Sequence, residues 1–327
     1  MMRLRRDMHL GVLFGLALLT YASNVSGDAA AICRKQTPPA LKQLKDVMSR
    51  GRFVSYEPTS LQIVDGHATR ASEASIADDV TVLRKRFDGL ITYGALHGAE
   101  RIPDVAAKMG FRAVIVGVWD ISNTEEIANA VAAWRRHPDV VVGISLGNEI
   151  VFGKRGTFES ILRVFETVRA QAKGVLLTTS EPFHLFDDSD AAATLAQIDF
   201  MLVNVHPVFQ PWFAHAPTEN AAQFVVNVVD RLAQIYCGPI LVKETGEPTA
   251  PAAAGYSQSR QAEFYRMLRD VFASTPMRAF AYFAAFDAPW RVDDSHPVPG
   301  YHPEEAHWGL YDDGRKPKAV VATIPEL

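Results

Sequence analysis

The chain has 327 residues, of which 48% are hydrophobic and 21% charged, with 21 glycines and 19 prolines. This composition is typical of a globular protein and excludes collagen-like, coiled-coil and disordered chains. The formal net charge of -4 provides no basic surface, so we expect no nucleic-acid partner. The length suits either two average domains or one (β/α)8 barrel.

Residues 1–27 have the pattern of a secretory signal peptide. Arg3, Arg5 and Arg6 precede an apolar run over residues 10–22, and small and polar residues follow it. The apolar run is too short to span a bilayer stably, so we expect no stable membrane span after signal removal. The alternative is an uncleaved N-terminal membrane anchor. We therefore expect an exported protein, periplasmic or secreted, and we expect it to be a monomer.

Two cysteines are present, Cys33 and Cys237, and neither belongs to a C-x-x-C motif. This excludes a cysteine-based zinc site or redox motif. In an oxidising compartment Cys33 and Cys237 could form a disulfide. Two buried free thiols are the alternative, because the sequence gives no distance between them.

Beyond this region the chain alternates strands with helices. Eight continuous apolar runs are predicted as strands, over residues 53–57, 89–93, 112–119, 140–146, 175–179, 200–205, 240–244 and 279–284. Helical patterns follow them, over 78–87, a segment ending at 108, 125–136, 157–173, 191–198, 222–236, 258–273 and 318–323. Strands buried on both faces and joined by helices form a parallel sheet. The pattern predicts an α/β fold, a single (β/α)8 TIM barrel.

The expected domain organisation has three parts. A signal peptide covers residues 1–27, an N-terminal lead-in covers 28–52, and the barrel covers 53–327. No linker or charge block divides the barrel, so we expect one domain.

Two glutamates end strands at the face of the barrel where active sites lie. Glu149 follows the fourth strand in SLGNEI, and Glu244 closes the seventh in LVKETG. These strands lie on opposite sides of the barrel mouth, so the two carboxylates are expected to face each other. Glycoside hydrolysis requires such a pair, with retention at a separation of about 5 to 5.5 Å and inversion at ~6.5 to 9.5 Å. The alternative is that either glutamate is an exposed strand end or an ion-pair partner.

Five motifs occur in register with the strands: Gly147-Asn-Glu149, Asn204-Val-His-Pro207, Lys243-Glu-Thr-Gly246, Phe283-Ala-Ala-Phe-Asp-Ala-Pro-Trp290 and His307-Trp-Gly-Leu-Tyr311. From about Arg52 to Pro317 the chain resembles glycoside hydrolase family 17, in its bacterial and fungal branch. The Asn-Glu pair and the second glutamate are common to the clan A retaining glycosidases. The last two motifs are much more specific to family 17.

The resemblance implies that Glu149 is the acid/base, Glu244 the nucleophile and Asn148 a hydrogen-bond donor to the sugar 2-hydroxyl. It implies a β-1,3-glucan oligo- or polysaccharide as substrate and no metal or organic cofactor. The substrate would be hydrolysed, in endo or exo fashion. The alternative is a transglycosylase, which moves glucosyl units onto a glucan with the same residues.

Other side chains are expected to shape the cleft. His206 could hydrogen-bond a hydroxyl or the nucleophile, and Asp287 could either contact a sugar or support residues that do. Four tryptophans at this face, Trp119 at a strand end and the others in loops, offer flat apolar rings to sugars, with packing as the alternative: Trp119, Trp212, Trp290 and Trp308. Lys243 adjoins Glu244 on a strand, so we expect its side chain to point to the opposite face and to pair elsewhere.

Several positions depart from the family 17 pattern. Glu247 stands where the family usually has Trp, Ala284 and Ala288 where Glu is common, and Val208 where Tyr is frequent. These changes alter the cleft without removing a catalytic carboxylate. A glycan-binding barrel with weakened or lost turnover is therefore a further alternative.

The segment GISLG over residues 143–147 matches the G-x-S-x-G motif of α/β-hydrolases, which would make Ser145 the nucleophile of an esterase. Its triad partners would come from Asp199, Asp230 and Asp287 and from His296, His302 and His307. The motif requires a tight strand-to-helix turn centred on the serine. Here the strand pattern continues to Glu149 and a loop precedes the next helix, which argues against an esterase.

Overall fold

Eight parallel strands close into a barrel, which confirms the predicted single (β/α)8 TIM barrel. The computed structural model describes residues 38–293 and 301–327. Around the barrel the strands follow the order β1-β10-β9-β8-β7-β6-β5-β4. Their bounds are β1 Phe53–Tyr56, β4 Gly89–Thr92, β5 Ala113–Val118, β6 Val141–Asn148, β7 Leu176–Pro182, β8 Met201–Asn204, β9 Ile240–Glu244 and β10 Arg278–Tyr282. Each predicted apolar run overlaps one of these strands.

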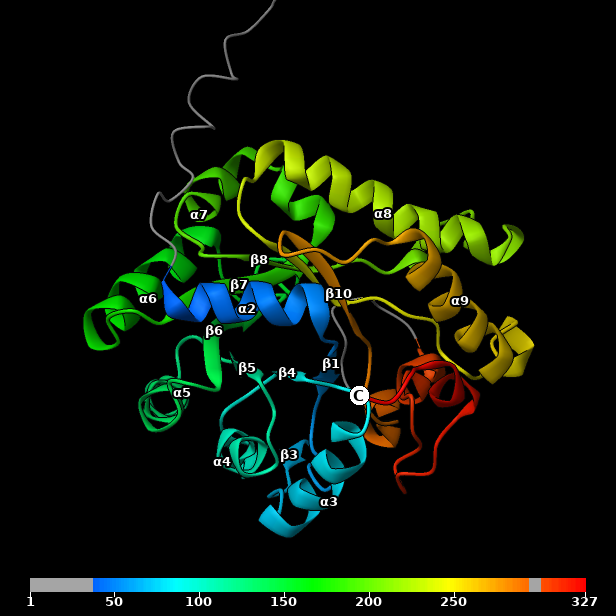
Figure 1. Ribbon diagram of the computed structural model, residues 1–327, viewed down its shortest axis with the longest axis horizontal. Coiled ribbons are helices and arrows are strands. Elements are labelled where there is room, and N and C mark those ends of the chain that lie inside the picture. The colour runs from blue at the N-terminus through cyan, green and yellow to red at the C-terminus, as the bar shows by residue number, and fades with distance from the viewer. Residues whose placement is uncertain (1–37, 294–300) are drawn as a thin grey trace, which may run out of the picture.

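Helices alternate with the strands and surround the barrel (Figure 1). Their bounds are α3 Glu73–Arg84, α4 Ile102–Lys108, α5 Thr124–Arg136, α6 Phe158–Gln171, α7 Ala192–Leu195, α8 Thr218–Ile235 and α9 Gln258–Val271. The predicted helix over 191–198 is reduced to α7 because Asp188 caps a 3-10 turn before it. The segment predicted over 318–323 is also a 3-10 helix, Ala319–Thr323.

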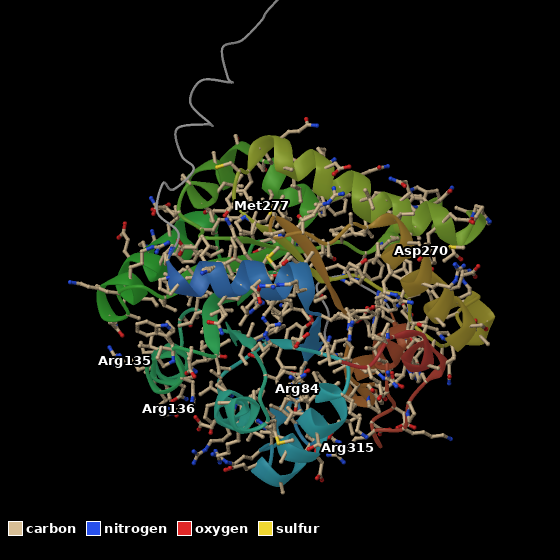
Figure 2. The ribbon with its side chains drawn as sticks, viewed as in Figure 1. Arg84, Arg135, Arg136, Asp270, Met277 and Arg315 are labelled. Atoms are coloured by element: carbon tan, nitrogen blue, oxygen red, sulfur yellow. The ribbon has the colours of Figure 1, made fainter. Side chains whose placement is uncertain are left out.

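The outer faces of these helices are polar. In Figure 2, Arg135 and Arg136 extend from the end of α5 and Asp270 from α9, and all three are exposed. The inner faces are apolar, as the buried residues Ile161, Phe165 and others of α6 illustrate. This amphipathic pattern fixes which side of each helix packs on the barrel.

A helix within the lead-in closes one end of the barrel. This helix, α2 Pro39–Arg50, lies across the strands in Figure 1. Its buried residues Leu41, Leu44, Val47 and Met48 form one apolar cluster with strand residues such as Leu202 of β8. The sequence analysis left this segment without a predicted helix, although its apolar spacing and Pro39 in the first turn are typical of one.

A short hairpin follows β1 and was not predicted. It pairs β2 Ile63–Val64 with β3 His67–Ala68 across a turn at Asp65 and Gly66, whose φ angles are 51° and 76°. Positive φ at both turn residues is the geometry that Asp-Gly favours in two-residue hairpins.

Some expectations concern residues that the structure does not describe. The signal peptide, Cys33 and His296 lie outside the described residues. Cys237 is disulfide-bonded, while its pairing with Cys33 stays a prediction. Within residues 38–293 and 301–327, no helix has both the length and the hydropathy to cross a membrane.

Candidate active site

The carboxyl ends of the strands surround a cleft of about 970 Å³. Glu149 and Glu244 both line it, as do Asn148 and His206. One side of the cleft is formed by the segment after β1, including the hairpin, and by the loop after β4. The structure therefore brings the two predicted carboxylates to a single site, at the face of the barrel where the sequence placed them.

The backbone after β6 directs Glu149 into this cleft. Gly147 has a φ of 90°, and a Cβ at this position would lie 2.4 Å from Cγ1 of Ile150. Glu149 itself has a φ of 53°, a left-handed conformation that costs energy for a residue other than glycine. Its backbone N–H donates to the carbonyl oxygen of Ser180 at 2.7 Å, which holds this conformation.

Burial and the negative charge of Glu244 raise the pKa of Glu149. Asn204 opposes this shift, because its Nδ2 donates to Oε1 of Glu149 at 2.9 Å. The Asn204 amide is oriented in turn by Ser180, whose hydroxyl donates to Asn204 Oδ1 at 3.0 Å. A carboxyl with a raised pKa retains its proton nearer to neutral pH, as a general acid must.

Glu244 ends β9, and its pKa is shifted in the opposite direction from that of Glu149. Burial alone would raise its pKa, but the Lys243 ammonium, the hydrogen bond from His206 and the charge of Arg291 outweigh burial and lower the pKa to about 2. Lys243 Nζ lies 3.3 Å from Oε1 of Glu244, and His206 Nε2 lies 3.3 Å from Oε2. The ionised carboxylate is the form in which a glutamate can act as a nucleophile.

The expectation that Lys243 points away from Glu244 is wrong. Two consecutive residues of β8, Val203 and Asn204, pair with β9 residues that are two positions apart, so Lys243 is the extra residue of an irregularity in the ladder. Such bulges re-aim side chains and break the strict alternation of a strand. Lys243 is only 1% exposed, and its ammonium lies beside Glu244, which lines the cleft.

Three further residues of the site were missed in the sequence analysis. Asn204 and Tyr93 lie at the carboxyl ends of β8 and β4, and Arg291 follows β10. Arg291 Nη2 donates to Glu57 Oε2 at 3.1 Å, so Glu57 is an ion-pair partner. For Asn204 and Tyr93 the available signal was the one used for the glutamates, a polar residue at the end of a buried strand, whereas Arg291 lies in a loop nine residues past β10.

Glu181 at the end of β7 was missed for a different reason, because the fifth strand was expected to end at 179. Its side chain is fully buried and accepts the backbone N–H groups of Val151 at 2.9 Å and Phe152 at 3.2 Å. Burial, reinforced by the charge of Glu149, raises its pKa to about 7 despite these hydrogen bonds. Glu181 therefore supports the turn that follows Glu149.

Three of the four tryptophans expected at the cleft line it. Trp308 is buried and packs edge-on against His206, with ring centres 5.2 Å apart. Trp290 is half-buried, and Trp119 is 46% exposed at the rim with the Arg155 guanidinium 4.6 Å from its ring centre.

Two expected cleft residues lie elsewhere. Trp212 packs against Phe224 of α8, with ring centres 5.5 Å apart, and does not line the cleft. Asp287 lines a small pocket beside the cleft and not the cleft itself, and its Oδ1 accepts hydrogen bonds from Lys318 Nζ at 2.6 Å and from the Gly309 N–H at 2.9 Å. Both residues stabilise the loops around the site instead.

Glu247 does not line the cleft either. Its side chain is fully buried, and Oε2 accepts a hydrogen bond from Arg260 Nε at 3.1 Å. Ala284 and Ala288 line a small pocket beside the cleft, and Val208 packs with the cluster around Trp308. These departures from the family 17 pattern therefore leave the groups around Glu149 and Glu244 in place.

Glu247 is expected to make stability depend on pH. Burial outweighs the Arg260 charge and raises its pKa to about 7. A carboxyl with a raised pKa stabilises the fold at low pH, and this contribution is lost as pH rises from about 4.5 through about 7. When the pH is raised from 5 to 8, the free energy of unfolding of the native protein should fall by about 2 kcal/mol more than that of Glu247→Gln.

Urea unfolding of the two proteins at several pH values measures this difference. Glu166→Gln, at an exposed position of α6, is the matched control and should follow the native pH dependence. Identical pH slopes for the native protein and Glu247→Gln would contradict the assignment.

The geometry does not fit an esterase centred on Ser145. Ser145 is 2% exposed within β6, and its hydroxyl donates to the carbonyl oxygen of Gly147 at 3.3 Å. The strand continues to Asn148, so the tight turn that a nucleophilic serine needs is missing at this position. Of the proposed acids, Asp230 pairs with Arg278 at the surface and Asp199 with Arg169.

In the described part of the chain, no group of three or more His, Cys, Asp or Glu side chains could hold a metal ion.

Comparison with known families gives a match to the BtgE/BtgC glycoside hydrolase domain over residues 54–309. The chain belongs to this glycoside hydrolase family. The matched range begins in β1 and extends past β10 to Gly309, so it covers the barrel with both candidate carboxylates.

The proteins similar to this BtgE/BtgC-type hydrolase carry the names of enzymes that act on glucans. A glucan 1,3-β-glucosidase of Arthroderma benhamiae is 26% identical over 263 residues, which are 75% of this chain and 83% of the relative. An endo-laminarinase from Formosa has a TM-score of 0.64 at 19% identity, covering 83% of this chain and 85% of its own. An active-site mutant of a Rhizomucor miehei β-1,3-glucanosyltransferase has a TM-score of 0.60 at 17% identity, covering 84% and 97%. These two structures support the barrel fold.

Proposed function

We propose that this BtgE/BtgC-type hydrolase cleaves β-1,3-glucan with retention of configuration, as a family 17 glycosidase. The observation that carries the proposal is the opposite protonation of two carboxyls in one cleft. Glu149 has a raised pKa and Glu244 a lowered one, at about 2. Environments that push two carboxyl pKa values apart assign the acid and the nucleophile.

In the first step Glu244 attacks the anomeric carbon of the sugar. The bond from this carbon to the leaving oxygen breaks, and that oxygen takes the proton of Glu149, which leaves a glycosyl ester on Glu244. In the second step the Glu149 carboxylate takes a proton from an incoming water, whose oxygen displaces Glu244. Asn204 orients Glu149 through its hydrogen bond to Oε1 of that carboxyl. Asn148 would donate a hydrogen bond to the sugar 2-hydroxyl.

The β-1,3-glucan specificity rests on the relatives and on the cleft. The Arthroderma relative is named for a 1,3-β-glucosidase, and the Formosa neighbour for an endo-laminarinase. The cleft carries aromatic rings on several sides, from Trp119, Phe209, Trp290 and Trp308. Such rings suit the apolar faces of pyranoses.

Hydrolysis and transfer share the glycosyl ester and differ only in whether water or a sugar hydroxyl accepts it. The Rhizomucor neighbour is named as a glucanosyltransferase, which keeps transfer as the second candidate. The protein is incubated with laminarihexaose, and the products are separated by mass. Shorter products alone indicate hydrolysis, whereas products longer than six units indicate transfer.

Early products examined by proton NMR should carry the β anomer if configuration is retained. An initial α anomer would contradict a retaining mechanism. No turnover of any β-1,3-glucan oligosaccharide would instead favour a glycan-binding barrel.

We also propose that the protein acts outside the cytoplasm. The disulfide at Cys237 is typical of an oxidising compartment. N-terminal sequencing of the protein recovered from its native cell would test removal of residues 1–27.

A further inference from the structure

Lys243 is a buried cation whose contacts extend beyond the nucleophile Glu244. It is 1% exposed, and its ammonium contacts three groups. Nζ lies 2.5 Å from Oδ1 of Asn148, 3.3 Å from Oε1 of Glu244 and 4.1 Å from the centre of the Tyr93 ring. A buried lysine is costly unless nearby groups compensate its charge, so this arrangement requires an explanation.

We propose that Lys243 is a shared counter-ion that balances the negative charge on Glu244 before the first step and on Glu149 after it. This inference rests on the proposed function, because it presupposes a glycosyl ester on Glu244. It makes Lys243 a positioning residue that acts through both carboxyls and through Asn148.

The charge balance of the first step supports this role. Before the reaction Glu244 is the carboxylate and Glu149 holds a proton. When the ester forms, Glu244 becomes neutral and the proton leaves Glu149 for the departing oxygen, so the negative charge moves from β9 to the end of β6. Burial lowers the pKa of Lys243, whereas the negative charges of Glu244 and of Glu149 raise it, so a carboxylate on either residue favours the protonated ammonium at each stage.

The contact with Asn148 links Lys243 to the second carboxyl. Asn148 is 6% exposed and immediately precedes Glu149 at the end of β6. Because Asn148 Oδ1 accepts from the ammonium, its Nδ2 remains as the donor, and Asn148 lines the cleft. Lys243 thereby also sets which end of the amide can meet a sugar hydroxyl.

Other charged groups surround this cluster. His206 contacts Glu244 from the end of β8, and Arg291, paired with Glu57, approaches the Tyr93 ring from the loop after β10. Burial and the charge of Glu244 raise the pKa of Tyr93, so its hydroxyl stays neutral. Among these groups, Lys243 contacts both Glu244 on β9 and Asn148 on β6, and it therefore connects the two strands.

Lys243→Met tests the proposal, since methionine retains much of the volume without the charge. The acid limb of the kcat/KM profile, set by Glu244, should move up by about one pH unit or more. At the native optimum, kcat/KM should fall about 10²-fold, as for loss of a group that stabilises developing charge. Lys243→Arg, which keeps the charge, should retain an acid limb close to the native one.

The second half of the proposal concerns breakdown of the ester. With a dinitrophenyl β-laminaribioside, ester formation is fast, so kcat reports the second step. In Lys243→Met this kcat should also fall, by about tenfold or more. A native kcat with a reduced kcat/KM would overturn the shared role and leave Lys243 as a partner of Glu244 alone.

Controls separate this proposal from the function on which it rests. Lys173→Met, at an exposed position, should leave both profiles unchanged. If Glu244→Ala is inactive while Lys243→Met keeps the native acid limb, the counter-ion proposal fails and the proposed function stands. If Glu244→Ala remains active, the proposed function itself fails.

Lys243→Gln covers the case in which the methionine variant does not fold. It keeps a donor for Asn148 without the charge, and it should show the same shift of the acid limb. The native enzyme provides a further check, because its acid limb should lie below the usual range of glutamate pKa values, about 4.3. A native acid limb within that range would overturn the proposal.

Discussion

Glu244→Ala should lower kcat on β-1,3-glucan oligosaccharides by at least about 10⁴-fold, because no group remains to form the glycosyl ester. Glu244 is buried at the end of β9 and is held ionised by Lys243 and His206. The measurement is steady-state turnover of laminarihexaose, with circular dichroism to show that the variant is folded.

Sodium azide provides the diagnostic result for Glu244→Ala. Azide is small enough to occupy the volume of the missing carboxylate and can attack the anomeric carbon from the same side. With an activated aryl β-glycoside the expected product is the α-glycosyl azide. Turnover at the native rate, or rescue that yields the β-glycosyl azide, would contradict the assignment of Glu244 as nucleophile.

Glu149→Ala should lose about 10²- to 10⁴-fold in kcat/KM on oligosaccharides, the usual contribution of a general acid. Burial and the charge of Glu244 raise the pKa of this carboxyl, which favours the protonated form that a sugar leaving group needs. A dinitrophenyl leaving group needs no proton, and the loss of kcat/KM on that substrate should be small. Azide should give the β-glycosyl azide, because it attacks the intact glycosyl ester from the opposite side.

The pH profile provides an independent check on Glu149. In the native enzyme, activity on oligosaccharides should fall as pH rises through the raised pKa of Glu149, because the general acid is then deprotonated. In Glu149→Ala this basic limb should be missing. Asp270→Ala, at an exposed position of α9, is the control and should keep it. A basic limb that persists in Glu149→Ala would assign the acid elsewhere.

The two carboxylates could be predicted because each directly follows a buried strand. An apolar run that ends in an ionisable residue must place that residue at the edge of the core, and in a parallel barrel these edges meet at one face. Asn204, Tyr93 and Glu181 satisfy the same rule and could have been found with it. The boundary of β7 hid Glu181, since the strand runs past the apolar residues to Pro182.

Lys243 shows where sequence periodicity fails. Strict alternation places neighbouring residues on opposite faces, but one extra residue in the β9 ladder puts Lys243 and Glu244 at the same site. The pairing register that produces this bulge is a property of two strands together. A residue in direct contact with the nucleophile was therefore assigned to the wrong side.

Trp212 and Asp287 show which question the position of a loop leaves open. Both lie in loops at the catalytic face, as predicted, yet Trp212 packs on α8 and Asp287 binds Lys318. Which loop residue faces a cleft depends on partners that are distant in sequence. For Asp287 the partner is 31 residues away, and nothing in the local sequence identifies it.

The amino-acid sequence by itself determined the barrel and the positions of Glu149 and Glu244, because continuous apolar runs specify buried strands and their polar ends specify one face. Only the tertiary structure decided how these carboxyls are charged. Their pKa values depend on burial and on charges brought from other strands, Lys243 and His206 for Glu244 and Glu244 itself for Glu149. Such electrostatic effects act through space, so they follow from which strands are neighbours and from the register between them.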